Sequence, residues 1–481
     1  MKKIILLSAF FYILAATFSE GFHHVDEHFQ LLEFANYKSG YTSADLLPWE
    51  FREQMRPTLQ PALAYSVQQG LFAIGDHNPF HLATLLRFLT AILSFITILL
   101  FARWAFSQIP ENQRRVQNSY FALAFLLWYS IYLNVRFSSE TWSGNFFILG
   151  FLAYHHQNFA RQRFWQILTG CLFGLSFLFR YQTGFAIFGF GLWALFISRQ
   201  SYITLICMAT GLMMMFGVGI LTDYWFYGDW VLSSWNYVVQ NLVENKAAQF
   251  GVSPLWFYAA QTPIWMFPLF GVLIIPALVY FFWKYPRHPL TWSIIPFLLI
   301  HHAIGHKEFR FLFPLANLLP YILILCATQM SAPNSPAKRF FVGLFSKLFW
   351  TLNTIFLVLI CLKPAHVEIP LYRYFYNEHT ENVRVFYLNN ENPFGAPLTF
   401  HLYQRPNFKF ASLASPADYA KVEPEGVTSD FIVIKTTHVE QFQTELINKP
   451  LVYENFHPFF KAHNYYNWME GVEAWSVFRL K

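Results

Sequence analysis

Two short polar segments carry the residues of this chain that are best suited to chemistry. The first is His23-His24-Val25-Asp26-Glu27-His28-Phe29-Gln30, which follows an apolar N-terminal run. The second is His306-Lys307-Glu308-Phe309-Arg310, which lies far down the chain and again between apolar runs. Adjacent acids beside a bilayer are unfavourable, so their presence there indicates a functional demand. A carboxylate centre and a cationic centre together suit group transfer from a phosphate-bearing donor.

Sugar transfer from a lipid phosphate needs a base and an anion site. One carboxylate takes the proton from the acceptor hydroxyl; we expect Asp26 to do so, with its neighbour Glu27 as the competitor. No general acid is required, because a phosphate leaving group is already a stabilised anion. Cationic side chains hold the phosphate while charge builds on it. The candidates for this role are His306, Lys307, Arg310, Arg136 and Arg180.

These residues also have structural interpretations. The acid pair is compatible with a solvated loop at a helix start. Arg136 and Arg180 stand at the ends of apolar runs, where arginine side chains reach toward the membrane interface. Lys307 and Glu308 are able to form an exposed ion pair of little energetic weight.

The histidines and cysteines do not form a clear metal site. His23, His24 and His28 have no clear acidic third ligand, so we expect neither a metal ion nor another cofactor. The four cysteines all lie inside apolar runs without metal-type spacing and are predicted to be small core residues: Cys171, Cys207, Cys326 and Cys361.

The composition indicates that membrane helices must position these residues. Hydrophobic residues make up 55% of the 481 residues and charged residues only 12%, against about 25% charged in globular domains. The chain is therefore predicted to be an all-α polytopic membrane protein. Its net charge of +6 does not indicate nucleic acid binding, because the basic residues cluster in short loops between helices.

About eleven apolar runs cross, or nearly cross, a bilayer about 30 Å thick. They are Ile4–Phe18, Leu82–Phe106, Ser119–Asn134, Ser143–Ala160, Phe164–Phe179, Gly184–Ser198, Tyr202–Leu221, Pro263–Trp283, Leu290–Ile304, Phe309–Met330 and Phe345–Leu362. With the N-terminus in the cytoplasm, alternation places most loop Lys and Arg residues, among them Arg114 and Arg115, on the cytoplasmic face. The two chemical segments then share the opposite face, as expected for an active site at the water interface.

Two longer polar segments lie on that outer face. Residues 20–81 contain helix-compatible stretches, which we expect to lie in the interface plane. Residues 363–481 contain strand-like runs separated by turns, at Val383–Leu388, Phe431–Lys435 and Trp475–Leu480. The predicted division is a membrane catalytic domain, residues 1–362, which includes the loop 20–81, and a small α/β domain outside the membrane, residues 363–481.

Several motifs in sequence order resemble one family. They are His-x-x-Asp-Glu at His23–Glu27, Trp49-Glu50 followed by Arg56-Pro57, and His306-Lys307-Glu308-x-Arg310-Phe311-Leu312-Phe313-Pro314. This pattern is similar to glycosyltransferase family 22, the polyprenyl-phosphate-mannose-dependent mannosyltransferases of the GT-C fold. The GPI-anchor mannosyltransferases and the α-1,2-mannosyltransferase of lipid-linked oligosaccharide assembly are the nearest branch.

Further segments extend the resemblance over roughly residues 20–320. They are Arg136 with Glu140, Asp223 with Tyr227-Gly228, Trp235-Asn236-Tyr237 with Asn241, and the loop Gln249–Tyr258. Three positions depart from the family pattern: Phe309 replaces a second Glu, His24-Val25 replaces His-Pro, and Arg56-Pro57 replaces Arg-Ser.

The resemblance implies an inverting enzyme that moves a mannosyl or related hexosyl residue from a polyprenyl-phosphate sugar to a glycolipid or lipid-linked glycan, forming an α-linkage. The partners would be these two lipids and the membrane itself, and we expect a monomer. The resemblance also implies sugar or acceptor contacts, although loop capping is the alternative for the asparagines. The residues concerned are Trp49, Glu50, Arg56, Asn236, Tyr237 and Asn241.

Two other functions remain open on the sequence alone. A protein O-mannosyltransferase-like enzyme would keep the fold and change the acceptor. A transporter or flippase of a lipid-linked or anionic solute also carries charges at span ends, but the chain has no inverted repeat or paired broken helices. Short loops and the lack of a lysine-rich retrieval tail favour a bacterial inner membrane with a periplasmic active site, with an ER membrane and a lumenal site as the alternative.

Overall fold

The computed structural model of the chain consists of two compact units. It describes residues 1–109, 114–266, 269–329, 335–389, 391–395, 398–423, 429–456, 461, 465, 469, 472 and 474–481. The helical unit comprises Met1–Ser19, Trp49–Ala64 and Leu85–Lys363, and the sheet unit comprises Glu20–Pro48, Tyr65–Thr84 and Pro364–Lys481. The side chains of Arg114 and Arg115, and Met330 at the end of one predicted span, lie outside the described residues.

This division differs from the predicted one in the first polar segment. The sequence assigned residues 20–81 to the membrane domain. In the structure, the two ends of that segment pack with the C-terminal residues, and only Trp49–Ala64 belong to the helical unit. Aromatic packing accounts for the difference: Phe29 stacks on Phe400 with ring centroids 4.9 Å apart, a contact that the periodicity of neither segment specifies.

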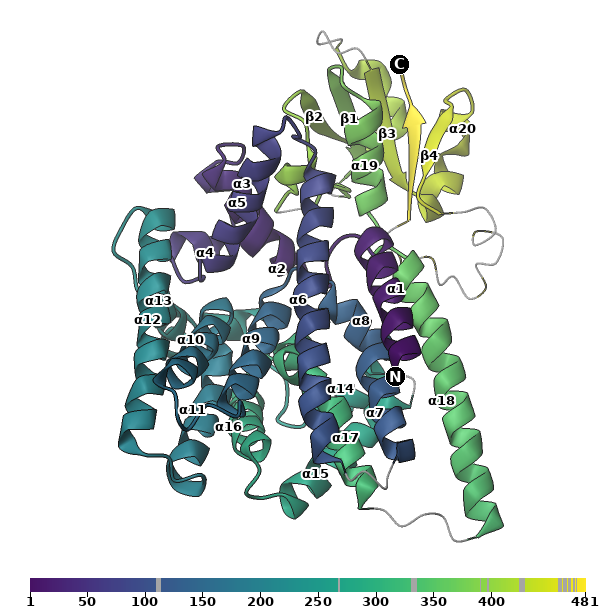
Figure 1. The fold of residues 1–481 in the computed structure, drawn as a ribbon. Coiled ribbons are helices and arrows are strands. Elements are labelled where there is room, and N and C mark those ends of the chain that lie inside the picture. Colours follow the sequence, from purple (N-terminus) through teal and green to yellow (C-terminus); the bar gives the residue numbers. More distant parts are fainter. Residues whose placement is uncertain are drawn as a thin grey trace. The chain divides into compact units, whose positions relative to one another are not determined.

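The helical unit holds the long apolar helices, shown in Figure 1. Its α-helices are α1 (Lys2–Phe18), α4 (Trp49–Arg52), α7 (Arg114–Leu126), α8 (Trp128–Asn134), α9 (Ser139–Tyr154), α10 (Arg163–Phe179), α11 (Gly184–Leu192), α12 (Tyr202–Tyr227), α13 (Ser233–Val238), α14 (Phe257–Trp265), α15 (Phe270–Lys284), α16 (Pro289–Ala303), α17 (Leu319–Thr328) and α18 (Pro336–Leu362). Short 3-10 or π segments are η3 (Tyr181–Thr183), η4 (Trp193–Ile197), η5 (Val239–Val243), η6 (Lys246–Phe250) and η7 (Phe309–Leu318). Two helices contribute residues to both units, α5 (Leu59–Ala73) and α6 (Pro79–Gln108).

Four segments of the described chain are long and apolar enough to cross a bilayer, judged by length and composition alone. They are α6, α12, Phe309–Thr328 and α18. Every predicted span overlaps a helix, whereas the total number of membrane crossings stays a prediction.

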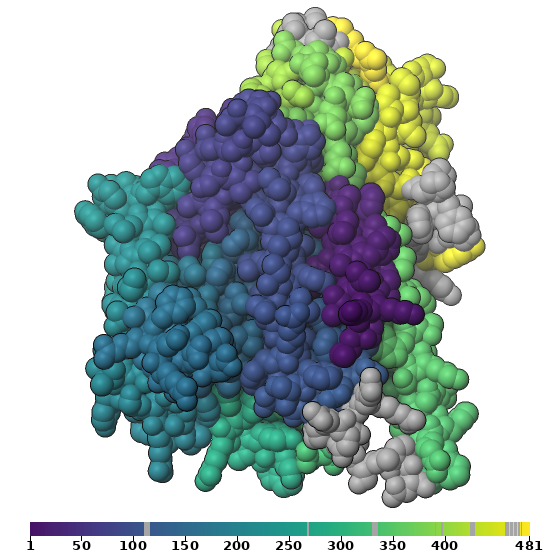
Figure 2. All heavy atoms as spheres, viewed as in Figure 1, coloured from purple at the N-terminus to yellow at the C-terminus, as the bar shows by residue number. Residues whose placement is uncertain are grey.

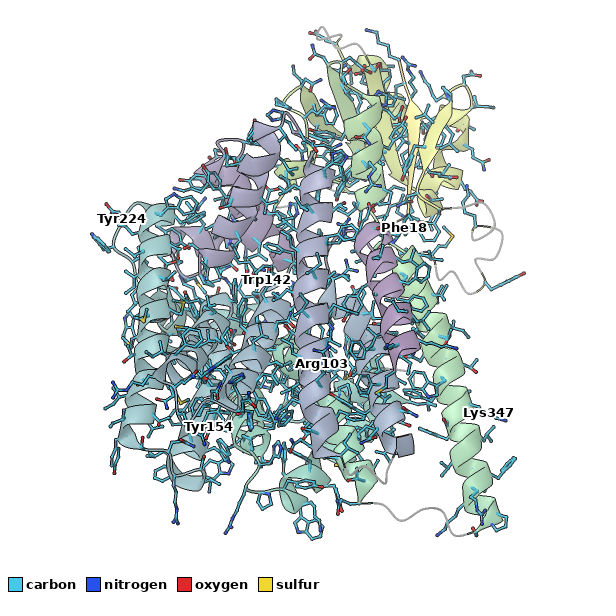
Figure 3. The ribbon with its side chains drawn as sticks, viewed as in Figure 1. Phe18, Arg103, Trp142, Tyr154, Tyr224 and Lys347 are labelled. Carbon is cyan, nitrogen blue, oxygen red and sulfur yellow. The ribbon has the colours of Figure 1, made fainter. Side chains whose placement is uncertain are left out.

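The outer surface of these helices has the pattern of lipid-facing segments. Exposed apolar side chains recur every three or four residues along α6, at Leu85, Leu89, Ile92, Ile96 and Leu100. Atoms of α6 form part of the surface shown in Figure 2. Tyr224 projects from the end of α12 (Figure 3) and stacks on Trp230 with ring centroids 4.4 Å apart. Exposed Tyr and Trp at a helix end are typical of a membrane–water interface.

One predicted span is broken into two helices. The run Ser119–Asn134 forms α7 and α8, because Leu127 between them is extended (φ −68°, ψ 128°). The side chain of Asn353 in α18 bridges the break: its Oδ1 accepts from the Trp128 amide at 3.1 Å, and its Nδ2 donates to the Leu126 carbonyl at 2.8 Å. A buried asparagine thus replaces helix hydrogen bonds that apolar surroundings do not satisfy.

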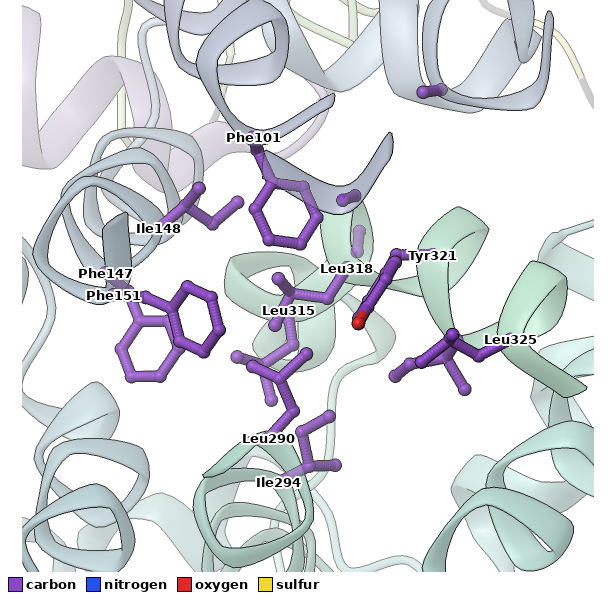
Figure 4. Close-up of a cluster of buried hydrophobic side chains, with 14 of the residues drawn as sticks. Phe101, Phe147, Ile148, Phe151, Leu290, Ile294, Leu315, Leu318, Tyr321 and Leu325 are labelled. Carbon is purple, nitrogen blue, oxygen red and sulfur yellow. The ribbon is translucent and has the colours of Figure 1, made fainter. Parts of the chain in front are cut away.

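Aromatic and branched side chains from several helices form the core of the helical unit. Phe101 of α6, Phe147 and Phe151 of α9 and Tyr321 of α17 belong to this cluster, part of which Figure 4 shows. Glycines permit the closest helix contact, between α10 and α12. A Cβ atom at Gly170 would overlap the backbone of α12, so small residues here set the helix separation.

The sheet unit contains a five-stranded sheet in the order β2-β1-β3-β5-β4. The strands are β1 (Val383–Leu388), β2 (Phe408–Leu413), β3 (Ser429–Lys435), β4 (Leu451–Glu454) and β5 (Trp475–Arg479). β1 pairs in parallel with β2 and β3, whereas β5 pairs antiparallel with β3 and β4. The short helices of the unit are α2 (Val25–Glu27), η1 (His28–Leu32), α3 (Glu33–Lys38), η2 (Ala44–Leu46), α19 (Ile369–Glu378), η8 (His401–Tyr403), η9 (Pro416–Lys421), η10 (Thr436–Phe442) and α20 (Gln443–Leu446).

The three strands predicted from the sequence are present as β1, β3 and β5. β1 and β3 are almost wholly buried, and most of their residues are apolar, as is typical of strands inside a sheet. An ion pair also links them: Nε and Nη2 of Arg384 lie 3.0 and 3.1 Å from the two carboxylate oxygens of Asp430. Where this unit lies relative to a membrane stays a prediction.

A buried carboxylate ties the first polar segment to the C-terminal residues within the sheet unit. Glu33, only 1% exposed, lies 2.9 Å from Nε2 of His28 and accepts from the Leu402 amide at 2.8 Å and from the Thr42 hydroxyl at 3.0 Å. Burial alone would raise the pKa of Glu33, but these hydrogen bonds outweigh burial and hold its pKa below the usual value. The ionised carboxylate is therefore a structural group.

We expect Glu33→Ala to lower the free energy of unfolding of the sheet unit by roughly 3 kcal/mol, because buried donors lose their partner. Thermal unfolding in detergent measures the change, and Glu440→Ala, at an exposed position of the same unit, is the control. Since the folded-state pKa lies below the unfolded one, the contribution is present at neutral pH and lost as the pH falls below 4.5. Equal melting temperatures for the two variants at neutral pH would contradict this role.

Candidate active site

The structure separates the roles of the two adjacent acids. His24 begins α2, and its Nδ1 accepts from the Asp26 amide at 3.2 Å. In return, Oε1 of Glu27 accepts from the His24 amide at 3.3 Å, which completes a capping box. Glu27 is 9% exposed, whereas the Asp26 side chain is 24% exposed, with one oxygen 3.6 Å from the His24 ring. Glu27 therefore fixes the helix start, and Asp26 is the more accessible carboxylate.

Three of the five predicted cationic residues, Arg180, Arg310 and His306, gather around two glutamates. Nη1 of Arg180 lies 2.7 Å and Nη1 of Arg310 3.5 Å from the same Glu140 oxygen. Arg310 also pairs through Nε with Glu308, and Glu308 in turn lies 2.9 Å from Nε2 of His306. The two arginines and Glu140 are at most 7% exposed, so this is a buried ion network.

Lys307 stands beside this network on the same segment. Its Nζ donates to the Ser253 carbonyl at 3.0 Å and the Gly305 carbonyl at 3.4 Å, and the residue is 6% exposed. Three permanent cations, Arg180, Arg310 and Lys307, stand against the carboxylates of Glu140 and Glu308. One positive charge is therefore in excess, and protonation of His306 would add a second. An anionic ligand suits such a centre better than a neutral one.

A glycine allows the two halves of this network to meet. Glu140 lies in the first turn of α9, and Arg310 lies in η7. Gly144, one turn after Glu140, packs directly on the Pro314 carbonyl of η7, where a Cβ atom would overlap the backbone oxygen. The close approach of α9, which carries Glu140, to η7, which carries Arg310, thus depends on the glycine at position 144.

Arg136, also predicted as a phosphate ligand, is recorded in other contacts. Its guanidinium donates to the carbonyl and the hydroxyl of Ser19 at the end of α1 and lies over the Tyr132 ring, 4.5 Å from its centroid. Arg136 is only 1% exposed. These contacts indicate that it anchors the end of α1.

The predicted acceptor residues of segment 49–64 are held by neighbouring side chains of the helical unit. Trp49 stacks on Phe250 with ring centroids 6.1 Å apart. Glu50 lies 3.2 Å from Nη2 of Arg56, and the Arg56 guanidinium lies 5.8 Å from the Tyr237 ring centroid. The structure therefore brings Glu50, Arg56 and Tyr237 together, and their contact with an acceptor stays a prediction.

The side chains of the two predicted asparagines donate hydrogen bonds to backbone carbonyls. Nδ2 of Asn236 donates to the Glu53 and Gln54 carbonyls at 3.2 and 3.3 Å, at a point where Gln54 has a positive φ of 49°. Nδ2 of Asn241 donates to the Tyr237 carbonyl at 2.9 Å. Both contacts favour the loop-capping interpretation over sugar binding for these amides.

A second polar cluster was not among the predicted site residues. Asp223, 5% exposed, accepts from the Thr58 hydroxyl at 2.7 Å and from the Ser233 hydroxyl. Ser233 is also 2.6 Å from the Tyr181 hydroxyl. In the sequence, Asp223 was noted only as part of a family motif. Its position near the end of an apolar run is a signal that could have predicted a buried acid with hydrogen-bond partners. The cluster fixes segment 49–64 to α12.

The described ranges contain no group of three or more His, Cys, Asp or Glu side chains arranged to hold a metal ion.

Comparison with known proteins identifies the family. The sequence model of the Alg9-like mannosyltransferase family matches residues 3–406. The chain belongs to this family. As a member, it is similar to GPI alpha-1,2-mannosyltransferase 3 of Mus musculus, 24% identical over 324 residues, which are 64% of this chain and 54% of the relative. The Homo sapiens relative of the same name is 24% identical over 340 residues, 68% of this chain and 58% of the relative. The chain thus spans little more than half the length of these relatives.

A solved structure shares the fold of this family member. The structure of ArnT from Cupriavidus metallidurans bound to undecaprenyl phosphate matches with a TM-score of 0.53 and 10% identity, covering 99% of this chain and 97% of the other. The match agrees with the GT-C fold that the sequence resemblance implied.

Because Gly144 sets the spacing between Glu140 and Arg310, we expect Gly144→Ala to displace η7 and reduce sugar-transfer activity about a hundredfold. Gly217→Ala is the matched control, since a Cβ atom at Gly217 would meet open space within the same kind of helix. Initial rates and melting temperatures of both variants, measured side by side, test this. Unchanged activity in Gly144→Ala would show that the network does not depend on this close contact.

Proposed function

We propose that this protein transfers a mannosyl residue from a polyprenyl-phosphate donor to a glycolipid or lipid-linked glycan, with Asp26 as general base. The observation that carries the proposal is the buried cationic network around Glu140 and Glu308, in a chain of the Alg9-like mannosyltransferase family. Arg180, Arg310, Lys307 and His306 are the proposed phosphate ligands. Because Arg136 is engaged with Ser19, we leave it out of this set.

In the proposed reaction one C–O bond forms and one breaks, and the proton of the acceptor passes through Asp26 to water. Asp26 accepts the proton of an acceptor hydroxyl as the oxygen attacks C1 of the sugar. The C1–O bond to phosphate breaks, and its electron pair leaves with the polyprenyl phosphate. The excess positive charge of the network stabilises the additional negative charge on the phosphate. Attack opposite the leaving group converts a β-linked donor into an α-linked product.

The names of the relatives support one class of acceptor. The relatives named above are GPI alpha-1,2-mannosyltransferases, which supports a glycolipid with a mannose-type acceptor hydroxyl. We propose that transfer occurs on the extracytoplasmic face, which is the periplasm for a bacterial inner membrane or the lumen for an ER membrane.

The direct test is transfer of radiolabel from polyprenyl-phosphate-mannose to a crude lipid extract by the purified protein in detergent. Label in a glycolipid fraction supports the proposal, whereas label in added protein acceptors would indicate a protein O-mannosyltransferase. Solute accumulation in liposomes, without transfer of label, would indicate a transporter.

We expect Asp26→Asn to abolish transfer without lowering the melting temperature, because the amide keeps the shape and loses the base. Glu27→Gln should instead retain most activity, since an amide oxygen still accepts the capping hydrogen bond from His24. Transfer rates and melting curves of the two variants, measured in parallel, distinguish the residue that acts as general base from the residue that caps α2. Loss of activity in Glu27→Gln with retention in Asp26→Asn would reverse the assignment.

Donor binding should depend on the protonation of His306. The hydrogen bond to Glu308 raises the pKa of His306 above its usual value of 6.5, so the ring keeps its positive charge at higher pH than a free histidine. We expect the KM for the donor to increase as the pH rises through this raised pKa, with little change in the acceptor KM. His306→Gln should remove the inflection; a donor KM with the same pH profile in both proteins would exclude His306 from phosphate binding.

A further inference from the structure

The sheet unit contains a cavity that none of the proposed catalytic residues lines. Its volume is about 310 Å³, at the lower end of the range for small-molecule sites. Residues from all three chain segments of the unit line it, among them Asn36, Gln68 and Gln404. The cavity thus exists only because the first polar segment packs against the C-terminal residues.

Two amide side chains of the cavity wall have unused hydrogen-bonding capacity. Gln68, 4% exposed, accepts from the Ser39 hydroxyl at 2.6 Å through Oε1, and among the described residues no partner is recorded for its Nε2. The Gln404 side chain makes no recorded hydrogen bond within the described chain, and its Nε2 is buried without a partner. A buried amide nitrogen without a partner is unfavourable, so a ligand rich in hydroxyl groups would satisfy Gln404 and could also accept from the Nε2 of Gln68.

The charges of the cavity wall balance. Arg405 uses its Nε to donate to the Tyr376 carbonyl at 2.7 Å and lies over the Tyr376 ring at 4.2 Å. Asp76 accepts from the Asn78 amide at 2.9 Å, and this hydrogen bond lowers the pKa of Asp76, which keeps it ionised. The positive charge of Arg405 and the negative charge of Asp76 cancel, so these two side chains do not attract an anion. The wall therefore favours a neutral polar ligand over a phosphate.

Aromatic rings complete the wall. Phe72 stacks on His77 with ring centroids 4.5 Å apart, and Tyr41 meets Phe72 edge-on. A flat apolar ring beside planar amide and guanidinium groups matches a ligand that has an apolar C–H face and a rim of hydroxyl groups. A pyranose ring has both.

We propose that this cavity binds a neutral saccharide unit of the acceptor, remote from the hydroxyl that Asp26 deprotonates. Asn36 of the cavity wall follows Asp26 by ten residues on the continuous helical run from Val25 to Lys38. At 1.5 Å per residue the two positions are about 15 Å apart along the helix axis, so an acceptor that reaches both contains several sugar rings. The link to the acceptor rests on the proposed function; saccharide binding by the cavity does not.

Saccharide binding is tested on the full chain in detergent by saturation-transfer NMR. Four neutral trisaccharides are the probes: α-linked mannotriose, maltotriose, cellotriose and N-acetylated chitotriose. A sulfated disaccharide is the charged comparison. The variants are Gln404→Leu, which removes an amide, and Leu71→Trp, which fills the cavity. Gln441→Leu makes the same chemical change at an exposed position of the unit, and Asp26→Asn removes the proposed base.

At least one neutral trisaccharide should bind wild type, Gln441→Leu and Asp26→Asn alike, with affinity reduced five- to tenfold in Gln404→Leu and lost in Leu71→Trp. Binding of none of the neutral probes, binding only of the sulfated disaccharide, or equal binding by Leu71→Trp would overturn the proposal. In transfer assays, Gln404→Leu should raise the KM for a multi-sugar acceptor by the same factor and leave kcat and the donor KM unchanged.

Failure of the two proposals is distinguishable. If wild type transfers no sugar but binds a neutral trisaccharide through the cavity, the function is wrong and the binding site stands. If transfer occurs and Gln404→Leu and Leu71→Trp change neither binding nor the acceptor KM, the cavity proposal is wrong and the function stands.

Discussion

Burial of the Glu140 carboxylate between two arginines is the interaction on which the polar centre of the helical unit depends. A carboxylate at 1% exposure is tolerable only when its charge is compensated, and Arg180 and Arg310 supply that compensation from two other elements. Removing either arginine would leave the buried carboxylate with a single cationic partner. The charges of Arg180 and Arg310 balance those of Glu140 and Glu308, and Lys307 beside them supplies the excess positive charge that suits the centre to an anion.

The same principle recurs at three places where distant segments meet. Asp223 holds Thr58 across 165 positions of sequence, Glu140 meets Arg310 across 170, and Glu33 receives the Leu402 amide across 369. Each acid is buried and has several donors. In an apolar chain, such contacts are specific where hydrophobic packing is not, because an acid accepts only from donors placed at hydrogen-bonding distance.

The polar segment 20–84 is divided between two tasks. Its central part, residues 49–64, is clamped to the helical unit by Asp223 and Asn236, whereas its ends form one wall of the sheet unit and of its cavity. Two of the polar side chains predicted to contact substrate, Asn236 and Asn241, donate to backbone carbonyls instead. Both asparagines thus position the chain, and substrate binding by this segment stays a prediction.

The sequence by itself determined the membrane character, the position of the helices, three of the five strands and the identity of the acidic and cationic segments, because hydropathy and local periodicity are properties of neighbouring residues. It did not separate Asp26 from Glu27, since the difference lies in which carboxylate turns back to cap α2. Nor did the sequence distinguish the roles of Arg136 and Arg180, because both stand at the end of an apolar run. Only the fold shows that Arg136 contacts Ser19 and that Arg180 pairs with Glu140. The edge strands β2 and β4, the break at Leu127 and the cavity were decided by tertiary contacts with residues far away in the chain, and no local pattern encodes a partner at that distance.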